Sequence, residues 1–215
     1  MYRNRWALSR PFRHLLADWV AHEDVWAFQE MDLPPGWLGS TYDFWHYLDG
    51  HSEVRLHRRE DIWAWLVECE KKSDLELFSQ RDYWQHPLTF EQLRKGDCED
   101  HALWAWRKLG ELGFPARFFV GQWQPDGPVG LESGKHAWVT FEDEDGEYLV
   151  ESMASGVEEM VQPLAKAKPE YTPHLSVGHL RDTRIYGGFL QYREWLRKNR
   201  GHLWKGDPYR PLVGE

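Results

Sequence analysis

The chain has 215 residues, of which 41% are hydrophobic and 15% aromatic, and its formal net charge is -9 at pH 7. This length and composition predict a single compact domain with a full core. Phosphate binding needs clustered Lys and Arg, so the acidic balance argues against nucleic acid and against an anionic membrane surface. The only cysteines, Cys69 and Cys98, are too few for a disulfide framework or a four-cysteine zinc site.

The N-terminal part, from about residue 10 to 80, is expected to be mainly helical. Apolar residues at helical spacing predict a helix over 12–28 and a second helix over 59–72, with Cys69 on its core-facing side. A short helix is predicted over 89–94, where Thr89 would cap the start ahead of Gln92. No window reaches the ~18 apolar residues of a membrane span, and no apolar run follows the N-terminal charges. The expected location is therefore the cytoplasm.

A longer amphipathic helix is predicted to begin at Cys98, directly after a glycine turn, and to end at Gly113 and Pro115. A thiol at a helix start lies among unpaired backbone N–H groups, which favour a thiolate and lower the cysteine pKa. This position indicates a nucleophile. The alternative is that Cys98 is a small buried apolar residue, as free cysteines usually are.

Two strands of a hairpin are predicted over 134–141 and 147–152, because the segment between them is charged and ends in Asp-Gly. Side chains alternate between the two faces of a strand. With a four-residue loop over 143–146, Trp138 lies opposite Glu151 and His136 lies one diagonal step away, within reach of a long Glu side chain. Cys98, His136 and Glu151 then supply a nucleophile, a general base and a group that orients the base.

The C-terminal part has a weaker pattern. Residues 154–178 combine three prolines with charge and are expected to form loops, in which His174 and His179 would be exposed. A last helix is predicted over 185–200, and 201–215 is expected to be a tail. Fourteen tryptophans could line an aromatic substrate cleft or a sugar-binding platform, but most are expected to be core residues.

The order of these segments resembles the transglutaminase-like superfamily of papain-like cysteine enzymes, and most of all its bacterial transglutaminase-like cysteine peptidases. The resemblance covers roughly residues 82 to 153. One position departs from the family pattern, because Glu151 stands where the family usually has Asp. The matching segments are Tyr83-Trp84-Gln85-His86-Pro87-Leu88-Thr89-Phe90-Glu91, Gly96-Asp97-Cys98-Glu99-Asp100 with Ala102, Leu112-Gly113-Phe114-Pro115-Ala116-Arg117, His136-Ala137-Trp138-Val139, and the strand ending in Glu151.

The resemblance implies an α+β, papain-like fold, in which the nucleophile at a helix N-terminus packs on an antiparallel sheet. Residues 1–215 would form one domain, with a core over about 82–153, extra N-terminal helices and a C-terminal extension over about 154–215. The implied activity is cysteine-dependent acyl transfer, most simply hydrolysis of a peptide or amide. Protein cross-linking or deamidation is an alternative, and so is a non-catalytic binding or scaffold module that kept the fold. The oligomeric state is left open.

The resemblance also implies further site residues. Trp84 or the adjacent Gln85 would stabilise the oxyanion, with the backbone N–H of Cys98 as a second donor, and Trp138 lies beside the base as a candidate oxyanion or substrate contact. In the exported peptidases, acids that flank the nucleophile form part of a calcium site. Here Asp97, Glu99 and Asp100 could supply such oxygens. The alternative, which we favour from the sequence, is that these acids complement the helix dipole and that no cofactor is needed.

Overall fold

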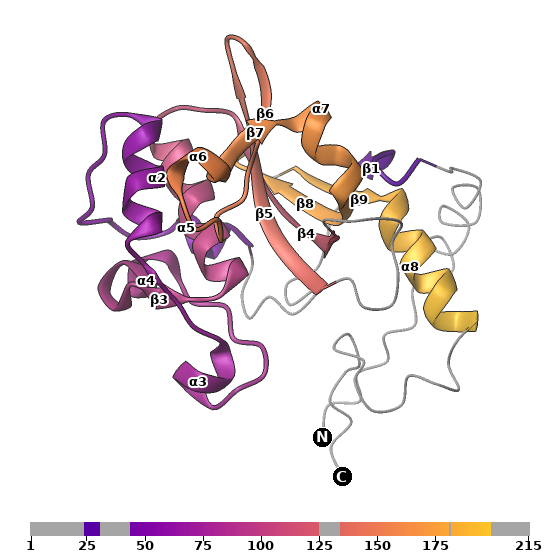
Figure 1. The fold of residues 1–215 in the computed structure, drawn as a ribbon, viewed down its shortest axis with the longest axis horizontal. Helices are drawn as coiled ribbons and strands as arrows, with labels where there is room; N and C mark the ends of the chain where they lie inside the picture. Colours follow the sequence, from indigo (N-terminus) through magenta and orange to yellow (C-terminus); the bar gives the residue numbers. More distant parts are fainter. Residues whose placement is uncertain (1–23, 31–43, 125–133, 181, 199–215) are drawn as a thin grey trace.

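The computed structural model describes residues 24–30, 44–124, 134–180 and 182–198. Its centre is a seven-stranded antiparallel sheet with the order β1-β9-β8-β4-β5-β6-β7 (Figure 1). Helices pack against this sheet, so the protein has the predicted α+β class. The strands are β1 (Phe28–Glu30), β4 (Ala116–Trp123), β5 (Gly134–Asp143), β6 (Gly146–Val150), β7 (Val161–Pro163), β8 (Tyr171–Gly178) and β9 (Thr183–Tyr186).

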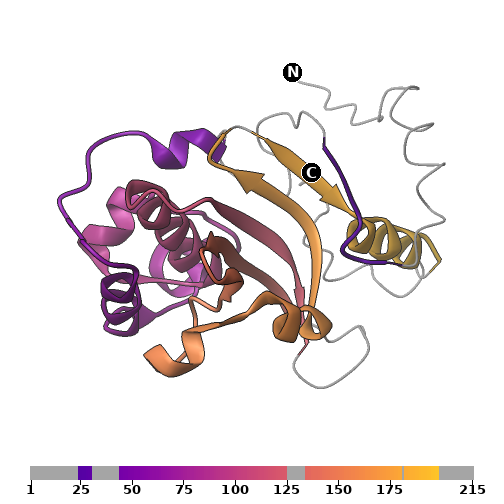
Figure 2. The same cartoon turned by 90° about the horizontal axis from the view of Figure 1, so that it is seen from above.

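The helices before β4 gather on one side of the sheet, as the purple and magenta ribbons in Figure 2 show. The central helix α5 packs against β4 and β5, while α2 and α4 pack on α5. Within the described segments no helix has the length and apolar character needed to cross a bilayer. The helical elements of this part are η2 (Phe44–Leu48), α2 (Arg59–Val67), α3 (Asp74–Phe78), α4 (Pro87–Leu93) and α5 (Cys98–Glu111).

Helix α5 begins at Cys98, as predicted. Asp97 caps the helix: its carboxylate accepts from the backbone N–H of Asp100, and the Asp100 carboxylate accepts from the backbone N–H of Asp97 at 3.3 Å. Gly96 allows this close approach, because a Cβ on Gly96 would lie 2.6 Å from the Asp100 Cβ. After the helix, Gly113 has φ 87°, a left-handed conformation that glycine adopts at little cost. These local interactions place the thiol at the first position of the helix.

Two predicted helix boundaries are wrong. Helix α2 ends at Val67, and Glu70–Lys71 instead form the short strand β2, which pairs with β3 (Lys95–Gly96). Helix α4 begins at Pro87, two residues before the predicted cap, because the His86 side chain accepts a hydrogen bond from the backbone N–H of Leu88. Proline is favoured at this first helical position, because its fixed φ suits the helix and it lacks an N–H that would go unpaired.

The β5–β6 hairpin has the predicted register. Val139 pairs with Val150, and the ladder runs out to Asp143 opposite Gly146. The turn is one pair tighter than predicted, since only Glu144 and Asp145 connect the strands. Gly146 has φ 140°, a backbone conformation that glycine adopts readily and that would be strained in a residue with a side chain. The register therefore directs His136 and Glu151 to the same face, as the alternation of side chains requires.

Residues 154–178 do not form a loop, contrary to the prediction. Strand β8 is buried along its whole length between β4 and β9, and His174 is fully buried. His179 is part-buried, with its ring stacked on the Trp106 ring at 4.9 Å. The loop was predicted because prolines are uncommon inside strands, yet Pro163 lies in β7 and Pro173 lies in β8. The other elements of this segment are α6 (Val157–Met160), α7 (Leu164–Ala167) and η3 (Lys168–Glu170).

The terminal helices differ from the predictions where the structure describes them. Residues 183–186 form strand β9, so the last helix, α8 (Gly187–Lys198), begins two residues later than predicted. Residues 28–30 form the edge strand β1 rather than the end of a helix. The remainder of the helix predicted over 12–28 lies largely outside the described residues, as does the predicted tail over 201–215.

The sheet separates two hydrophobic clusters. The larger cluster lies on the α5 side and includes Phe118, Val139 and the core cysteine Cys69, which is 7% exposed, as predicted. The smaller cluster lies on the opposite face. Its buried members are Phe119, Trp138, Leu149, Leu164, Ala167, Tyr171 and Tyr186.

Candidate active site

The Cys98 thiol lies at the start of α5, beside strand β5. The side chain is partly buried, and its Sγ donates to Glu99 Oε2 at 3.2 Å. The backbone N–H of Ala137 in β5 also donates a hydrogen bond toward the sulfur, which favours the thiolate. Ala137 directly follows His136, so the fold brings the predicted nucleophile to the strand that carries the predicted base.

His136 and Glu151 are in direct contact. His136 Nε2 donates to Glu151 Oε2 at 2.7 Å, and both side chains are largely buried. Because Nε2 is the donor, Nδ1 is left as the basic nitrogen of the imidazole. The structure therefore contains the contact between imidazole and carboxylate that the hairpin register predicts.

Two further donors hold the Glu151 carboxylate. The backbone N–H of Met153 donates to Oε1 at 3.0 Å, and the Tyr171 hydroxyl donates to Oε2 at 2.8 Å. Burial raises the pKa of Glu151, but the hydrogen bonds from His136, Tyr171 and Met153 outweigh it, so the net pKa lies below the ordinary value. Glu151 is thus kept as a carboxylate that can orient an imidazole.

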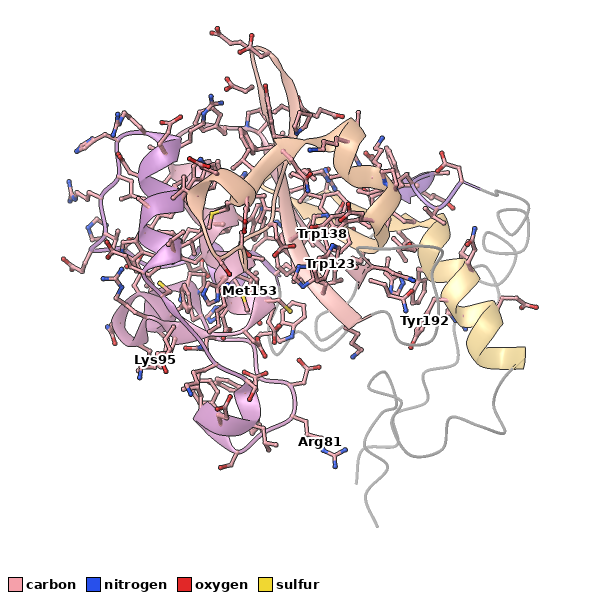
Figure 3. All side chains as sticks on the ribbon, viewed as in Figure 1. Arg81, Lys95, Trp123, Trp138, Met153 and Tyr192 are labelled. Carbon is pink, nitrogen blue, oxygen red and sulfur yellow. The ribbon has the colours of Figure 1, made fainter. Side chains whose placement is uncertain are left out.

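Sequence analysis missed Tyr171 and Trp123. The two residues are paired across β8 and β4 with their ring centroids 6.5 Å apart, and Figure 3 labels Trp123 in the central part of the molecule. The Trp123 ring lies 5.6 Å from the His136 ring, and the side chain is 36% exposed. A strand signal was present in the alternation of Leu175 and Val177, but the prolines around it obscured that signal.

The predicted oxyanion and substrate residues are all buried. Trp84 Nε1 donates to Asp82 Oδ1 at 2.8 Å, and the Gln85 amide donates to the Lys95 carbonyl and to Asp100. In this conformation the donors of Trp84 and Gln85 are therefore occupied by protein acceptors, and an oxyanion role for either stays a prediction. Trp138 is fully buried and stacks on Phe119, with ring centroids 5.4 Å apart. Its ring therefore has no face that a substrate could contact in this conformation.

The acids around the nucleophile form a larger cluster than the sequence indicated. Asp74 and Asp82 join Asp97, Glu99 and Asp100, with candidate ligand atoms of each group of three within 4.8 Å of one another. Burial and neighbouring charges raise the pKa of Asp74 to about 6 and that of Asp100 to about 8. In the described part of the chain, Asp74 Oδ1 and Asp97 Oδ1 are buried and have no hydrogen-bond partner. This donor set consists of hard oxygens, which suit calcium.

These acids reverse the expected effect of the helix start on Cys98. The sequence predicted a lowered pKa, whereas the pKa of Cys98 is raised well above its usual value. Burial is the largest cause, followed by the charges of Glu99 and Asp97, and the Ala137 N–H opposes them only in part. The same residues that complement the helix dipole therefore disfavour a thiolate.

Residues 48–150 match the model of the Transglutaminase-like superfamily. Solved structures of Legionella pneumophila LapG are similar. The calcium-bound form is 21% identical, with a TM-score of 0.43 over 56% of this chain and 64% of that chain. The EGTA-treated form is 20% identical, with a TM-score of 0.42 over 55% and 60%.

This chain thus matches less than two thirds of the length of either LapG chain. A search of curated proteins gave no match. The matched segment, 48–150, contains Cys98 and His136 and ends one residue before Glu151. Residues 48–150, just under half of the chain, are therefore a segment of the transglutaminase-like superfamily, and they lie within the α+β fold described above.

Proposed function

We propose that this protein is a cysteine-dependent acyl-transfer enzyme that hydrolyses a peptide or amide bond through Cys98, His136 and Glu151. The observation that carries the proposal is the hydrogen bond from His136 Nε2 to the Glu151 carboxylate at 2.7 Å. It leaves Nδ1 as the base on a strand that also contacts the thiol through Ala137. A nucleophile, a base and a group that orients the base are what acyl transfer requires.

The reaction would proceed in two halves. His136 takes the proton of Cys98 as the sulfur attacks the carbonyl carbon, and the leaving amine departs with that proton when the C–N bond breaks. Water then attacks the thioester, and His136 takes a proton from this water and returns it to the sulfur as the C–S bond breaks, so that the carboxylic acid product leaves and the thiol is restored. Because the pKa of Cys98 is raised, transfer of the proton to His136 is expected to accompany attack rather than precede it.

The accessible face of Trp123 supplies a surface beside the base. Its ring is close to His136 and remains one third exposed, so it could hold an apolar part of the acyl group. A protein or peptide substrate fits this chemistry, and a cytoplasmic location stays a prediction from the sequence. Protein cross-linking or deamidation would form the same kind of thioester from an amide side chain with release of ammonia, and an amine would then attack it in cross-linking or water in deamidation.

Hydrolysis of p-nitrophenyl acetate tests the proposal, because this ester reports acylation of a thiol without knowledge of the natural substrate. Cys98→Ser and His136→Ala should each abolish release of p-nitrophenolate, whereas Cys69→Ser should retain it, since Cys69 lies in the core. Retained hydrolysis in Cys98→Ser would reject the catalytic proposal. Complete inactivity of the wild-type protein toward esters and peptides would favour the scaffold alternative.

The acidic cluster supports a second candidate function, calcium binding next to the nucleophile. Asp74, Asp82, Asp97 and Glu99 would supply the oxygens, because Asp100 is already held by Gln85 through both of its oxygens. The supporting observation is the pair of buried oxygens, Asp74 Oδ1 and Asp97 Oδ1, that lack partners among the described residues. With a cation held there, Glu99 and Asp97 would no longer raise the pKa of the thiol. Calorimetric titration with calcium tests this candidate.

A further inference from the structure

The hydroxyl of Tyr171 reaches the Glu151 carboxylate from strand β8, across β4 and β5. It donates at 2.8 Å to Oε2, the same oxygen that accepts from His136 Nε2 at 2.7 Å. Tyr171 belongs to β8, which is separated from β6 by β4 and β5. We propose that Tyr171 is a positioning residue of the proposed reaction, which fixes Glu151 so that Glu151 can hold the His136 imidazole. This inference rests on the proposed function.

A bulge in β8 directs Tyr171 to this face. Val120 pairs with Leu175, but Gly121 pairs with Pro173, so the register shifts by one residue at His174. Without that shift, Tyr171 would share the face of Leu175 and Val177, which belong to the cluster on the α5 side. With the shift, Tyr171 joins the opposite cluster, and its ring lies 6.4 Å from the His136 ring.

The surroundings of Tyr171 hold its ring in place. The side chain is 2% exposed, and its ring packs edge-on against the Trp138 ring at 5.0 Å. Trp26 Nε1 donates to the Tyr171 carbonyl at 3.0 Å, which ties the start of β8 to the N-terminal part. Gly121 makes the space, because a Cβ there would lie 2.7 Å from the Trp138 ring. A ring fixed in this way presents its hydroxyl in one direction.

Glu151 needs such support more than an aspartate would. A glutamate has one more rotatable bond than an aspartate, so its carboxylate loses more conformational freedom when it is held in one position. Met153 N–H holds Oε1 and Tyr171 holds Oε2, so only one orientation of the carboxylate satisfies both donors. Burial and the Glu151 charge raise the pKa of Tyr171, so the hydroxyl remains protonated and continues to donate. Tyr171 thereby restricts the carboxylate without touching the substrate.

Tyr171→Phe tests the inference, with Tyr186→Phe as the matched control. Tyr186 is a buried tyrosine of the same hydrophobic cluster, but its hydroxyl bonds to Ser176. With p-nitrophenyl acetate, Tyr171→Phe should lower kcat by roughly 10- to 100-fold, as expected for loss of a hydrogen bond to a charged group, with little change in KM. Tyr186→Phe should leave kcat within about twofold of wild type, since it removes a hydrogen bond away from the reacting groups.

A double-mutant cycle separates positioning from general destabilisation. If Tyr171 acts through Glu151, adding Tyr171→Phe to Glu151→Gln should lower kcat by less than about a further twofold, because the two residues act as one unit. A general structural defect would lower kcat by the same factor in the wild-type and Glu151→Gln backgrounds. Equal losses in both backgrounds, or a Tyr171→Phe variant as active as Tyr186→Phe, would overturn the inference. If Cys98→Ser retains hydrolysis, the proposed function itself fails.

Discussion

Glu151 accepts a hydrogen bond from His136 Nε2 at 2.7 Å, although His136 lies on β5 and Glu151, 15 positions later, directly follows β6. The contact depends on a register in which Val139 faces Val150. A shift of one residue would send Glu151 to the opposite face and break the contact.

Glu151→Gln should leave the fold intact and lower kcat on p-nitrophenyl acetate by about 10⁴-fold, the order expected when a carboxylate that orients a catalytic histidine becomes an amide. Glu151→Asp should also lose activity, because a side chain shorter by one bond of about 1.5 Å cannot reach His136, Tyr171 and Met153 together. Steady-state kinetics and circular dichroism check both variants.

Glu142→Gln is the control for charge removal, since Glu142 is exposed near the turn of the same hairpin. It should behave as wild type. Full activity of Glu151→Gln, together with loss in a variant of a turn carboxylate, would contradict the role assigned to Glu151.

Glu99→Gln should speed alkylation of Cys98 by iodoacetamide at pH 7. Glu99 raises the pKa of the Cys98 thiol through its charge and through the hydrogen bond that its Oε2 accepts from Sγ, so its replacement should lower that pKa and increase the thiolate fraction. Each unit by which the pKa falls should raise the rate about tenfold while the thiol remains mainly protonated. Peptide mass spectrometry gives the rate for each cysteine separately.

Cys69 provides an internal reference, because burial raises its pKa to about 11. Its slow alkylation should be the same in wild type and Glu99→Gln. Glu147→Gln, an exposed position on β6, should change neither rate. An unchanged Cys98 rate in Glu99→Gln would show that burial alone suppresses the thiolate.

The acidic cluster predicts that stability falls as pH rises when no divalent cation is present. The folded-state pKa of Asp74 is about 6 and that of Asp100 about 8, both above the ordinary 3.8, so the folded state binds more protons than the unfolded state. Stability should therefore be greatest near pH 4 and decrease up to pH 8. For Asp74 alone the loss is about 3 kcal/mol at 1.4 kcal/mol per pKa unit. Urea unfolding in EGTA measures it.

Asp74→Asn should flatten this pH dependence, and calcium should reduce it in the wild-type protein if the cluster binds the cation. Asp182→Asn is the matched control, because the pKa of Asp182 is lowered and its partner is Arg117. That variant should retain the decrease between pH 4 and pH 8. The same slope in Asp74→Asn and wild type would contradict the predicted contribution of Asp74.

Trp123→Ala should raise KM for p-nitrophenyl esters that have long acyl chains more than for the acetate. The exposed face of Trp123 lies beside His136 and offers apolar area to the acyl group. We expect kcat to change less than KM, because the donors that hold the Glu151 carboxylate are His136, Met153 and Tyr171 and Trp123 is not among them. An equal effect on all chain lengths would exclude Trp123 from acyl-group binding.

The features that depend on neighbours along the chain could be predicted from the sequence. The helix start at Cys98 follows from the Asp97 cap and the apolar spacing after it, and the contact between His136 and Glu151 follows from a hairpin with alternating faces. These features involve interactions within a single helix turn or hairpin, so local pattern contains the information.

The residues from distant parts of the chain that complete the site could not be predicted, because their positions depend on how separate elements pack. Tyr171 reaches Glu151 because a bulge reverses the faces of β8, and no periodicity in the sequence marks that bulge. The pKa of Cys98 is raised rather than lowered, because packing buries the thiol and holds the carboxylates of Glu99 and Asp97 close to it. Burial and charge–charge distance depend on the packing of separate elements, and for that reason the chemistry of the thiol could not be inferred from its position at a helix start.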